Sequence, residues 1–397
     1  MAELPFAMIP SSLQPAPPPP PPHDDRFPGD GAQVRASAWG DSAGMPANLE
    51  GIVRIAFERN FSDVHLGVGE QPRFRSRGDI VRTGWPVTDS TTFLDWMREM
   101  LGPAEIDMFQ RDKEYDGSHA FSFVRVRINL MESLRGPAMV LRLIPQKIAT
   151  LEELSLPAVL KDLAERPKGM LLVTGPTGSG KTTTLAAIID YINTAMKRHI
   201  LTIEDPIEFV HESRESLIRQ REVRLHTKVF KSALRAALRE DPDVILIGEI
   251  RDQETLTIAM EASQTGHLVL GTLHTNSAVR TVERVIGMFP PEQKEEIRKE
   301  VSESLLAVIS QGLVKTTDGK RCAFHELFIN TDACRDYIQR GELDEIESLM
   351  ARSGFDGMQT ANQSLLSLVQ SGQISDEEAL SHSLKPSELS QALRGRT

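Results

Sequence analysis

The chain has 397 residues, enough for two or three domains that each bury a core. Its formal net charge of -11 argues against nucleic acid or an acidic membrane surface as the main partner, because both favour clustered lysine and arginine. Two cysteines are too few for a disulfide framework and fit a reducing compartment. No stretch approaches the roughly 18 apolar residues of a membrane span, and the N-terminus lacks a signal-peptide pattern. We therefore expect a soluble, cytoplasmic protein without a nucleic-acid partner.

The first 46 residues have almost no β-branched side chains from which to build a core. They include six consecutive prolines, Pro17 to Pro22. This composition predicts that residues 1–46 are a disordered tail, partly in polyproline II conformation. A docking motif for a partner is the alternative.

Residues 47–150 have the pattern of a small α+β domain. Residues 48–59 indicate a helix, and residues 62–78 alternate as two short strands around a glycine-containing turn. Two further strands are indicated at 121–130 and 137–144.

Arginines gather on the second pair of these strands. Arg125 and Arg127 share one strand face, because successive side chains of a strand point to opposite faces. Arg135 and Arg142 follow nearby in the sequence. This face either is simply solvated or contacts an anion.

From residue 151 onward, apolar runs of strand length alternate with helical segments. The runs are 169–175, 199–203, 244–248 and 267–273. Such alternation predicts an α/β fold, with a mostly parallel sheet covered on both faces. From Pro290 the period is helical, and 290–313 is its clearest amphipathic stretch.

The strongest chemical signal is GPTGSGKT, which fits the phosphate-loop pattern G-x-x-x-x-G-K-[ST]. It follows a predicted strand and opens a helix, as phosphate binding requires, so a mere glycine-rich turn is a poor alternative. Gly178 and Gly180 let backbone N–H groups turn toward phosphates. Lys181 can reach the β and γ phosphates, and the Thr182 hydroxyl can bind Mg²⁺. The expected ATP-binding residues are Gly175, Pro176, Thr177, Gly178, Ser179, Gly180, Lys181, Thr182 and Thr183.

Three other strands deliver acid and imidazole groups at their carboxyl ends. The run 199–203 leads to Glu204, Asp205 and Glu208, the run 244–248 to Glu249, and the run 267–273 to His274. Ligands of an open α/β sheet bind beyond the carboxyl ends of its strands. We therefore expect these side chains to converge on the nucleotide.

His267 and His274 cannot share a metal ion, because seven residues of extended strand separate them by about 23 Å. His274 is a candidate γ-phosphate sensor. His267 is better explained as a subunit-contact or structural residue.

These motifs resemble the PilT-like secretion ATPases that power type IV pili. The resemblance runs from about Leu49 to about Glu378 and includes several long motifs in the same order. Among them are SDVHL, LVTGPTGSGKTTTLAAIIDYIN, LTIEDPIEFVHES, ALREDPDVILIGEIRD, TGHLVLGTLHTNSA and GMQTANQSLLSLVQSGQIS.

The resemblance implies a PAS-like N-terminal domain, at 47–150, followed by a RecA-like ATPase domain at 151–397, assembled as a homo-hexamer that uses ATP and Mg²⁺. The family's aspartate box maps to 204–208, and its atypical Walker B motif to Glu249. Its histidine box comprises His267 and His274. Glu208 and Glu249 are the pair expected to position the attacking water, and arginines of the N-terminal domain are expected to close over the nucleotide. The arginine candidates are Arg127, Arg135 and Arg142.

Within the family, the sequence favours pilus retraction over assembly. Related assembly ATPases usually have longer N-terminal regions and a tetracysteine zinc element, whereas Cys322 and Cys334 are the only cysteines here. We therefore expect a twitching-motility ATPase at the cytoplasmic face of the inner membrane, working with a pilus platform protein. A paralogous retraction ATPase is a further candidate partner. The proline tail and the TANQ segment depart from the family's usual pattern and leave open which paralogue this is.

Three other functions stay open. One is an accessory, PilU-like retraction ATPase, and a second is an assembly ATPase of pili or type II secretion. The third is a DNA-handling RecA-like ATPase, which the acidic charge and the lack of interleaved aromatic and basic residues disfavour.

The position before Glu249, where many ATPases place a magnesium-holding aspartate, is Gly248. We hypothesise that Glu204 and Asp205, with Thr182, bind the metal instead. Gly248 would then leave room for the acidic segment to approach the end of the neighbouring strand.

Overall fold

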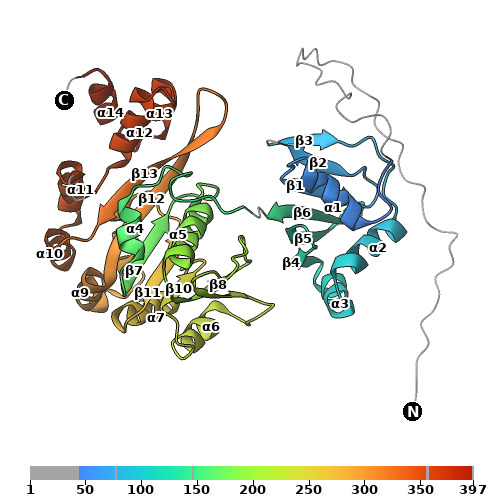
Figure 1. Cartoon of the computed structure of the whole chain (residues 1–397), viewed down its shortest axis with the longest axis horizontal. Helices are drawn as coiled ribbons and strands as arrows, with labels where there is room; N and C mark the ends of the chain where they lie inside the picture. Colours follow the sequence, from blue (N-terminus) through green and yellow to red (C-terminus); the bar gives the residue numbers. More distant parts are fainter. Residues whose placement is uncertain (1–43, 77, 145–146, 355–356, 396–397) are drawn as a thin grey trace. The chain divides into compact units, whose positions relative to one another are not determined.

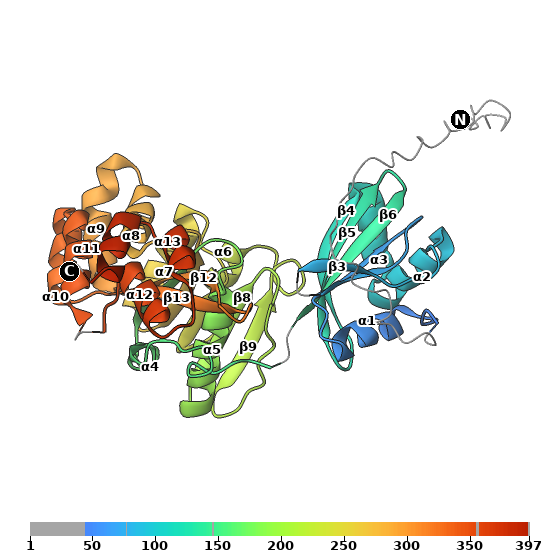
Figure 2. The ribbon, with the colours of Figure 1, turned by 90° about the horizontal axis from the view of Figure 1, so that it is seen from above.

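The computed structural model describes residues 44–397, except 77, 145–146, 355–356 and 396–397. The predicted disordered tail falls almost entirely on residues outside this range. Two β-sheets organise the described residues (Figures 1 and 2). The domain boundary expected near residue 150 stays a prediction.

The first sheet has six antiparallel strands in the order β3-β2-β1-β6-β5-β4. Its strands are β1 (Asp63–Gly67), β2 (Arg73–Ser76), β3 (Asp79–Arg82), β4 (Glu114–Ala120), β5 (Arg125–Ser133) and β6 (Gly136–Ile144). The same part of the chain forms three helices, α1 (Leu49–Glu58), α2 (Ser90–Met100) and α3 (Pro103–Asp112). This is the small α+β, PAS-like domain that the resemblance implies.

Helix α1 shows how the sequence specifies this packing. Asn48 caps its N-terminus by accepting a hydrogen bond from the backbone N–H of Gly51. Leu49, Ile52 and Ala56 are fully buried, and their spacing places them on one helix face. The apolar stripe therefore sets which side of α1 faces the domain core.

The second sheet has seven strands in the order β13-β12-β7-β11-β10-β8-β9, and only β13 runs antiparallel to its neighbour. They are β7 (Gly169–Thr174), β8 (His199–Glu204), β9 (Leu217–Glu222), β10 (Val244–Ile247), β11 (Leu268–Leu273), β12 (Leu305–Lys315) and β13 (Arg321–Ile329). Every residue of β7, β10 and β11 is buried, as expected for parallel strands covered on both faces. The predicted α/β fold is confirmed.

Two helical layers cover this sheet. Helices α4 (Val159–Ala164) and α5 (Lys181–Ala195) pack on one face, and α6 to α11 supply most of the core on the other. The latter are α6 (Phe230–Ala237), α7 (Gln253–Gln264), α8 (Ala278–Gly287), α9 (Lys294–Ser304), α10 (Asp332–Arg340) and α11 (Leu343–Arg352). A short 3-10 helix, Pro291–Gln293, precedes α9, and α12 (Ala361–Gln370), α13 (Asp376–His382) and α14 (Pro386–Leu393) form a separate cluster against Val314. None of the helices in the described residues is both long and apolar enough to cross a membrane.

One prediction from periodicity is wrong. The sequence predicts a helix over the whole amphipathic stretch 290–313. In the structure, α9 ends at Ser304 and the chain continues as strand β12. Strand β12 lies inside the sheet between β7 and β13, so its side chains are buried on both faces. A continuous apolar run has no two-residue alternation, and it therefore cannot be told from a buried helix by period alone.

Candidate nucleotide-binding and catalytic site

The predicted phosphate loop joins β7 to α5. Gly175, Gly178 and Gly180 have φ values of 142°, 80° and 89°, a left-handed region in which a side chain is strained. A Cβ at Gly175 would lie 2.2 Å from the carbonyl oxygen of Gln311. Helix α5 begins at Lys181 without a side-chain cap, so its first N–H groups are available to an anion.

Lys181 points back over this loop. Its Nζ donates hydrogen bonds to the carbonyl oxygens of Gly175, at 2.8 Å, and Pro176, at 3.0 Å. Burial lowers the pKa of Lys181, while the negative charges of Glu249 and Glu208 oppose this shift. The ammonium group is thus bonded to the loop and interacts with the charges of the two carboxylates expected to position water.

A buried glutamine that the sequence motifs do not reveal fixes the loop from the neighbouring strand. Gln311 of β12 donates from Nε2 to the carbonyl oxygen of Ser179 at 2.7 Å and accepts from Thr184 Oγ1 of α5 at 2.6 Å. The Ser179 hydroxyl is buried and has no hydrogen-bond partner among the described residues. Such an orphaned donor beside unpaired N–H groups fits a loop built to receive phosphate oxygens. Gln311 was not a candidate because the sequence predicts a helix, not a strand, at 305–313.

Glu249 follows β10 and lies between two basic groups. Its Oε2 accepts from Arg251 at 2.7 Å, and its Oε1 lies 3.1 Å from His274 Nε2 at the end of β11. The hydrogen bond from Arg251 is the main cause that lowers the pKa of Glu249. The carboxylate is therefore held ionised, as a group that orients or activates water must be. The structure brings Glu249 and His274 together as predicted, and Arg251 is an addition.

The two acids predicted to bind metal have protein partners. Glu204 is buried and accepts from Thr202 Oγ1 at 2.6 Å and Gln220 Nε2 at 3.2 Å. Burial raises the pKa of Glu204 to about 7. Asp205 is exposed and pairs with Arg224 at 3.3 Å. In the described part of the chain no group of three acidic, histidine or cysteine side chains forms a ready metal site, so magnesium binding by Glu204 and Asp205 stays a prediction.

The two histidines flank β11, as predicted. His274 follows its carboxyl end, whereas His267 precedes its amino end, where its carbonyl oxygen accepts from the N–H of Gly169. Its ring Nδ1 lies 2.9 Å from the carbonyl oxygen of Ala262. His267 thus contacts the residues around the amino end of β11, at the opposite end of the strand from the nucleotide edge.

The predicted arginine face is only partly formed. Arg127 and Arg142 are direct cross-strand neighbours on β5 and β6. Arg142 Nε donates to Asp63 at 2.8 Å, and Arg127 lies 3.9 Å from a carboxylate oxygen of Asp116. Arg135 instead lies in the turn at the far end of the β5–β6 hairpin, about 26 Å along the strand from its start. The proposed roles of these arginines at the nucleotide stay predictions.

A buried, mostly parallel sheet with a phosphate loop after its interior strand β7, and with carboxylates at the ends of β8 and β10, defines a RecA-like P-loop ATPase. The chain belongs to the type II/IV secretion system protein family, whose pattern matches residues 41–385. This membership confirms the resemblance found from the sequence motifs.

Two relatives and one solved structure cover most of the chain. The "Twitching motility protein" of Neisseria gonorrhoeae is 49% identical, over 78% of this chain and 83% of its own length. The "Type IV pilus retractation ATPase PilT" of Pseudomonas aeruginosa is 45% identical, over 83% of this chain and 96% of its own. The crystal structure of the pilus retraction motor PilT with bound ADP matches with a TM-score of 0.82 and 40% identity, covering 87% of this chain and all of that chain.

Proposed function

We propose that this chain is the ATPase motor that retracts type IV pili, coupling ATP hydrolysis to removal of pilin from the pilus base and so to twitching motility. The observation that carries the proposal is a phosphate loop with an ionised carboxylate beside it. Lys181 lies on the phosphate loop, and an ionised Glu249 is held beside it by Arg251 and His274. The chain matches named retraction ATPases over nearly their full length.

The residues fit ATP as follows. The N–H groups at the start of α5 receive the phosphates, and Lys181 exchanges its bonds with the carbonyl oxygens of Gly175 and Pro176 for bonds with phosphate oxygens. Thr182, Glu204 and Asp205 would hold magnesium, which would neutralise phosphate charge. Glu249 and the exposed Glu208 orient the attacking water.

The active form is a homo-hexameric ring at the cytoplasmic face of the inner membrane. Arg127 and Arg142, which are cross-strand neighbours, approach the nucleotide in that ring and stabilise transition-state charge, whereas Arg135 lies at the far end of the hairpin from them. The ring acts on an inner-membrane platform protein of the pilus, and a paralogous retraction ATPase is a second partner.

Deletion of the gene tests the direction of work. We expect surplus surface pili and loss of twitching, with rescue by the wild-type gene but not by Lys181→Ala, because that variant loses the charge on the β and γ phosphates. Bald cells would instead show an assembly ATPase. Full rescue by Lys181→Ala would show an accessory subunit whose own turnover is dispensable. Circular dichroism of purified Lys181→Ala confirms that the fold is intact.

A further inference from the structure

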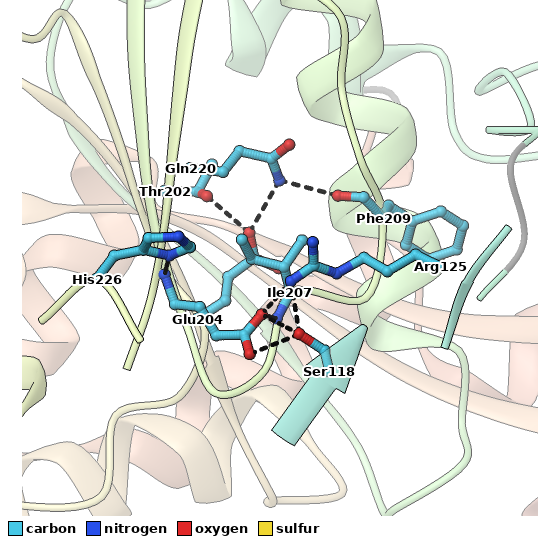
Figure 3. Close-up of polar contacts among 9 residues, drawn as sticks. Ser118, Arg125, Thr202, Glu204, Ile207, Phe209, Gln220 and His226 are labelled. Carbon is cyan, nitrogen blue, oxygen red and sulfur yellow. Dashed lines mark hydrogen bonds and ion pairs between the residues drawn. The ribbon is translucent and has the colours of Figure 1, made fainter. Parts of the chain in front are cut away.

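A largely buried polar cluster lies on β9, the edge strand of the large sheet, outside the phosphate loop (Figure 3). Gln220 and Glu222 are two residues apart on this strand, so their side chains share one face. Both contact the acidic segment 204–208, which carries the proposed water-positioning Glu208. Neither residue was a candidate from the sequence motifs.

Gln220 binds both ends of this segment. Its Nε2 donates to Glu204 Oε1 at 3.2 Å and to the carbonyl oxygen of Phe209 at 2.8 Å. Its Oε1 accepts from the N–H of His211 at 2.8 Å. A single side-chain amide therefore fixes the chain before and after Glu208.

Glu222 binds the middle of the segment. Its side chain is 2% exposed, and Oε2 accepts from the N–H of Ile207 at 3.2 Å. The next N–H, that of Glu208, donates to the buried carboxylate of Glu204. Two buried carboxyl groups therefore accept hydrogen bonds from two successive backbone N–H groups, those of Ile207 and Glu208. These bonds fix the backbone at Glu208 and so the direction of its side chain.

The charge of Glu222 is balanced from the N-terminal sheet. Arg125 of β5 donates from Nη2 to Glu222 Oε2 at 2.7 Å and to Ser118 Oγ at 2.6 Å. Ser118 of β4 donates to Glu222 Oε1 at 2.9 Å. Both sheets belong to the compact unit Met45–Thr397. Breaking such a buried pair by removing one partner leaves an uncompensated charge, which a protein relieves by local rearrangement.

We infer that Glu222 is a positioning residue, through which Arg125 of the N-terminal sheet fixes the acidic segment and thereby the placement of Glu208. The inference rests on the proposed ATPase function and adds a specific connection between the two sheets. Arg125 shares its strand face with Arg127, a proposed nucleotide clamp. A movement of β5 toward or away from the nucleotide would therefore also change the bond between Arg125 and Glu222. Glu222 does not itself contact the phosphates.

A double-mutant cycle on kcat tests the connection, using Glu222→Gln, Arg125→Gln and the double variant of the full chain. Each single change should lower kcat by about tenfold to 100-fold, as expected when a catalytic group is misplaced by about an ångström, with the Kd of ATP changed by less than about threefold. The double variant should be no slower than the slower single variant, because both changes break one unit. Arg125→Lys should recover part of the rate, since it restores the positive charge.

Arg221→Gln is the matched control. Arg221 is adjacent on β9 and forms an ion pair with Glu240 at 3.1 Å, but it points away from the acidic segment. Its kcat should stay within about twofold of wild type, as for most surface changes. If Glu222→Gln fails to fold, Arg125→Gln and Ser118→Ala test the inference in its place. The inference then requires that these variants lower kcat while the Kd of ATP stays nearly unchanged.

The inference would be overturned if kcat were unchanged in the Glu222 and Arg125 variants, or if the two losses multiplied in the double variant. ATP turnover by the wild-type chain would still support the proposed function in that case. A folded wild-type ring without ATP turnover would contradict the proposed function itself. The two failures are therefore distinguishable.

Discussion

Gly248 and Glu204 approach each other so closely that a side chain at residue 248 would be crowded. A Cβ at Gly248 would lie 3.2 Å from Cα of Glu204 and 3.2 Å from the carbonyl oxygen of Ile203. The N–H of Gly248 donates to that same oxygen at 2.8 Å. The end of β10 is therefore held against the start of the acidic segment, which supports the hypothesis that Gly248 makes room for it.

Gly248→Asp should impair turnover. The new side chain requires the backbone at Glu204 to move by a few tenths of an ångström. It also adds a carboxylate close to Glu204 and Glu249, where like charges raise each other's pKa. We expect kcat to fall by about tenfold or more, measured as phosphate release at saturating ATP. Gly248→Ala separates the steric part of the effect from the charge.

The opposite result would assign the metal to the strand end. If Gly248→Asp raised kcat while Glu208→Gln had no effect, the aspartate familiar from other ATPases would be restoring a lost function. The proposed division of work between the acidic segment and Glu249 would then be wrong.

Glu249→Gln and Glu208→Gln should each reduce kcat by roughly 10² to 10⁴-fold, the range for a lost general base, while ATP still binds. Arg251→Gln should reduce kcat less, because Arg251 only holds Glu249 in its ionised form. Single-turnover kinetics and nucleotide binding by fluorescence separate the two steps. Equal and mild effects in all three variants would exclude Glu249 as the group that activates water.

Stability should depend on pH through Glu204. Burial raises the pKa of Glu204 to about 7 in the folded chain, against 4.5 for the exposed group. Between these values the folded state keeps a proton that the unfolded state has lost. The contribution of Glu204 to the free energy of unfolding is therefore fully present below about pH 4.5 and is lost as pH rises through about 7. The total loss is about 3 kcal/mol.

Glu204→Gln removes this titration and is the direct comparison. The free energy of unfolding of the variant, relative to wild type, should rise between pH 4.5 and 7.5 in urea denaturation. The comparison cancels His211 and His325, whose burial lowers their pKa to about 4 and which act in the opposite direction. A difference that stays constant with pH would show that Glu204 is ionised throughout this range.

Local motifs were sufficient to predict the chemistry of the strand ends. Lys181, Glu249 and His274 lie where the phosphate-loop pattern and the parallel order of β7, β10 and β11 place them. These predictions succeed because each residue follows directly on a recognisable strand. The carboxyl ends of parallel strands necessarily meet at one edge.

The contacts that hold the site depend on pairings between distant segments. Gln311 reaches the phosphate loop only because β12 lies beside β7, and an apolar run does not reveal that it is a strand. Arg125 and Glu222 lie 97 residues apart in sequence and belong to different sheets. No periodicity or spacing connects such residues, so the partners of the acidic segment required the structure.

Arg142 provides the test of the ring. Its side chain is 65% exposed although Nε is bound to the buried Asp63, so the rest of the guanidinium is available to a ligand. If it completes a nucleotide site in the assembled ring, turnover per subunit should rise steeply with protein concentration near the assembly midpoint. Arg142→Ala should then lower kcat more than ATP affinity, by about 10² to 10³-fold, because charge clamps act mainly on the transition state.

Asp63→Asn distinguishes this clamp from a purely structural ion pair. Asp63 also lies 3.8 Å from Arg75 and accepts from Ser62 at 2.7 Å, so its loss should mainly lower the melting temperature. The variant should keep most of its kcat, because Arg142 retains its charge. Equal losses of kcat in Asp63→Asn and Arg142→Ala would show that Arg142 acts only through the fold of β1 and β6. Full specific activity in a dilute monomer would exclude a clamp of any kind, since the site would then be complete within one chain.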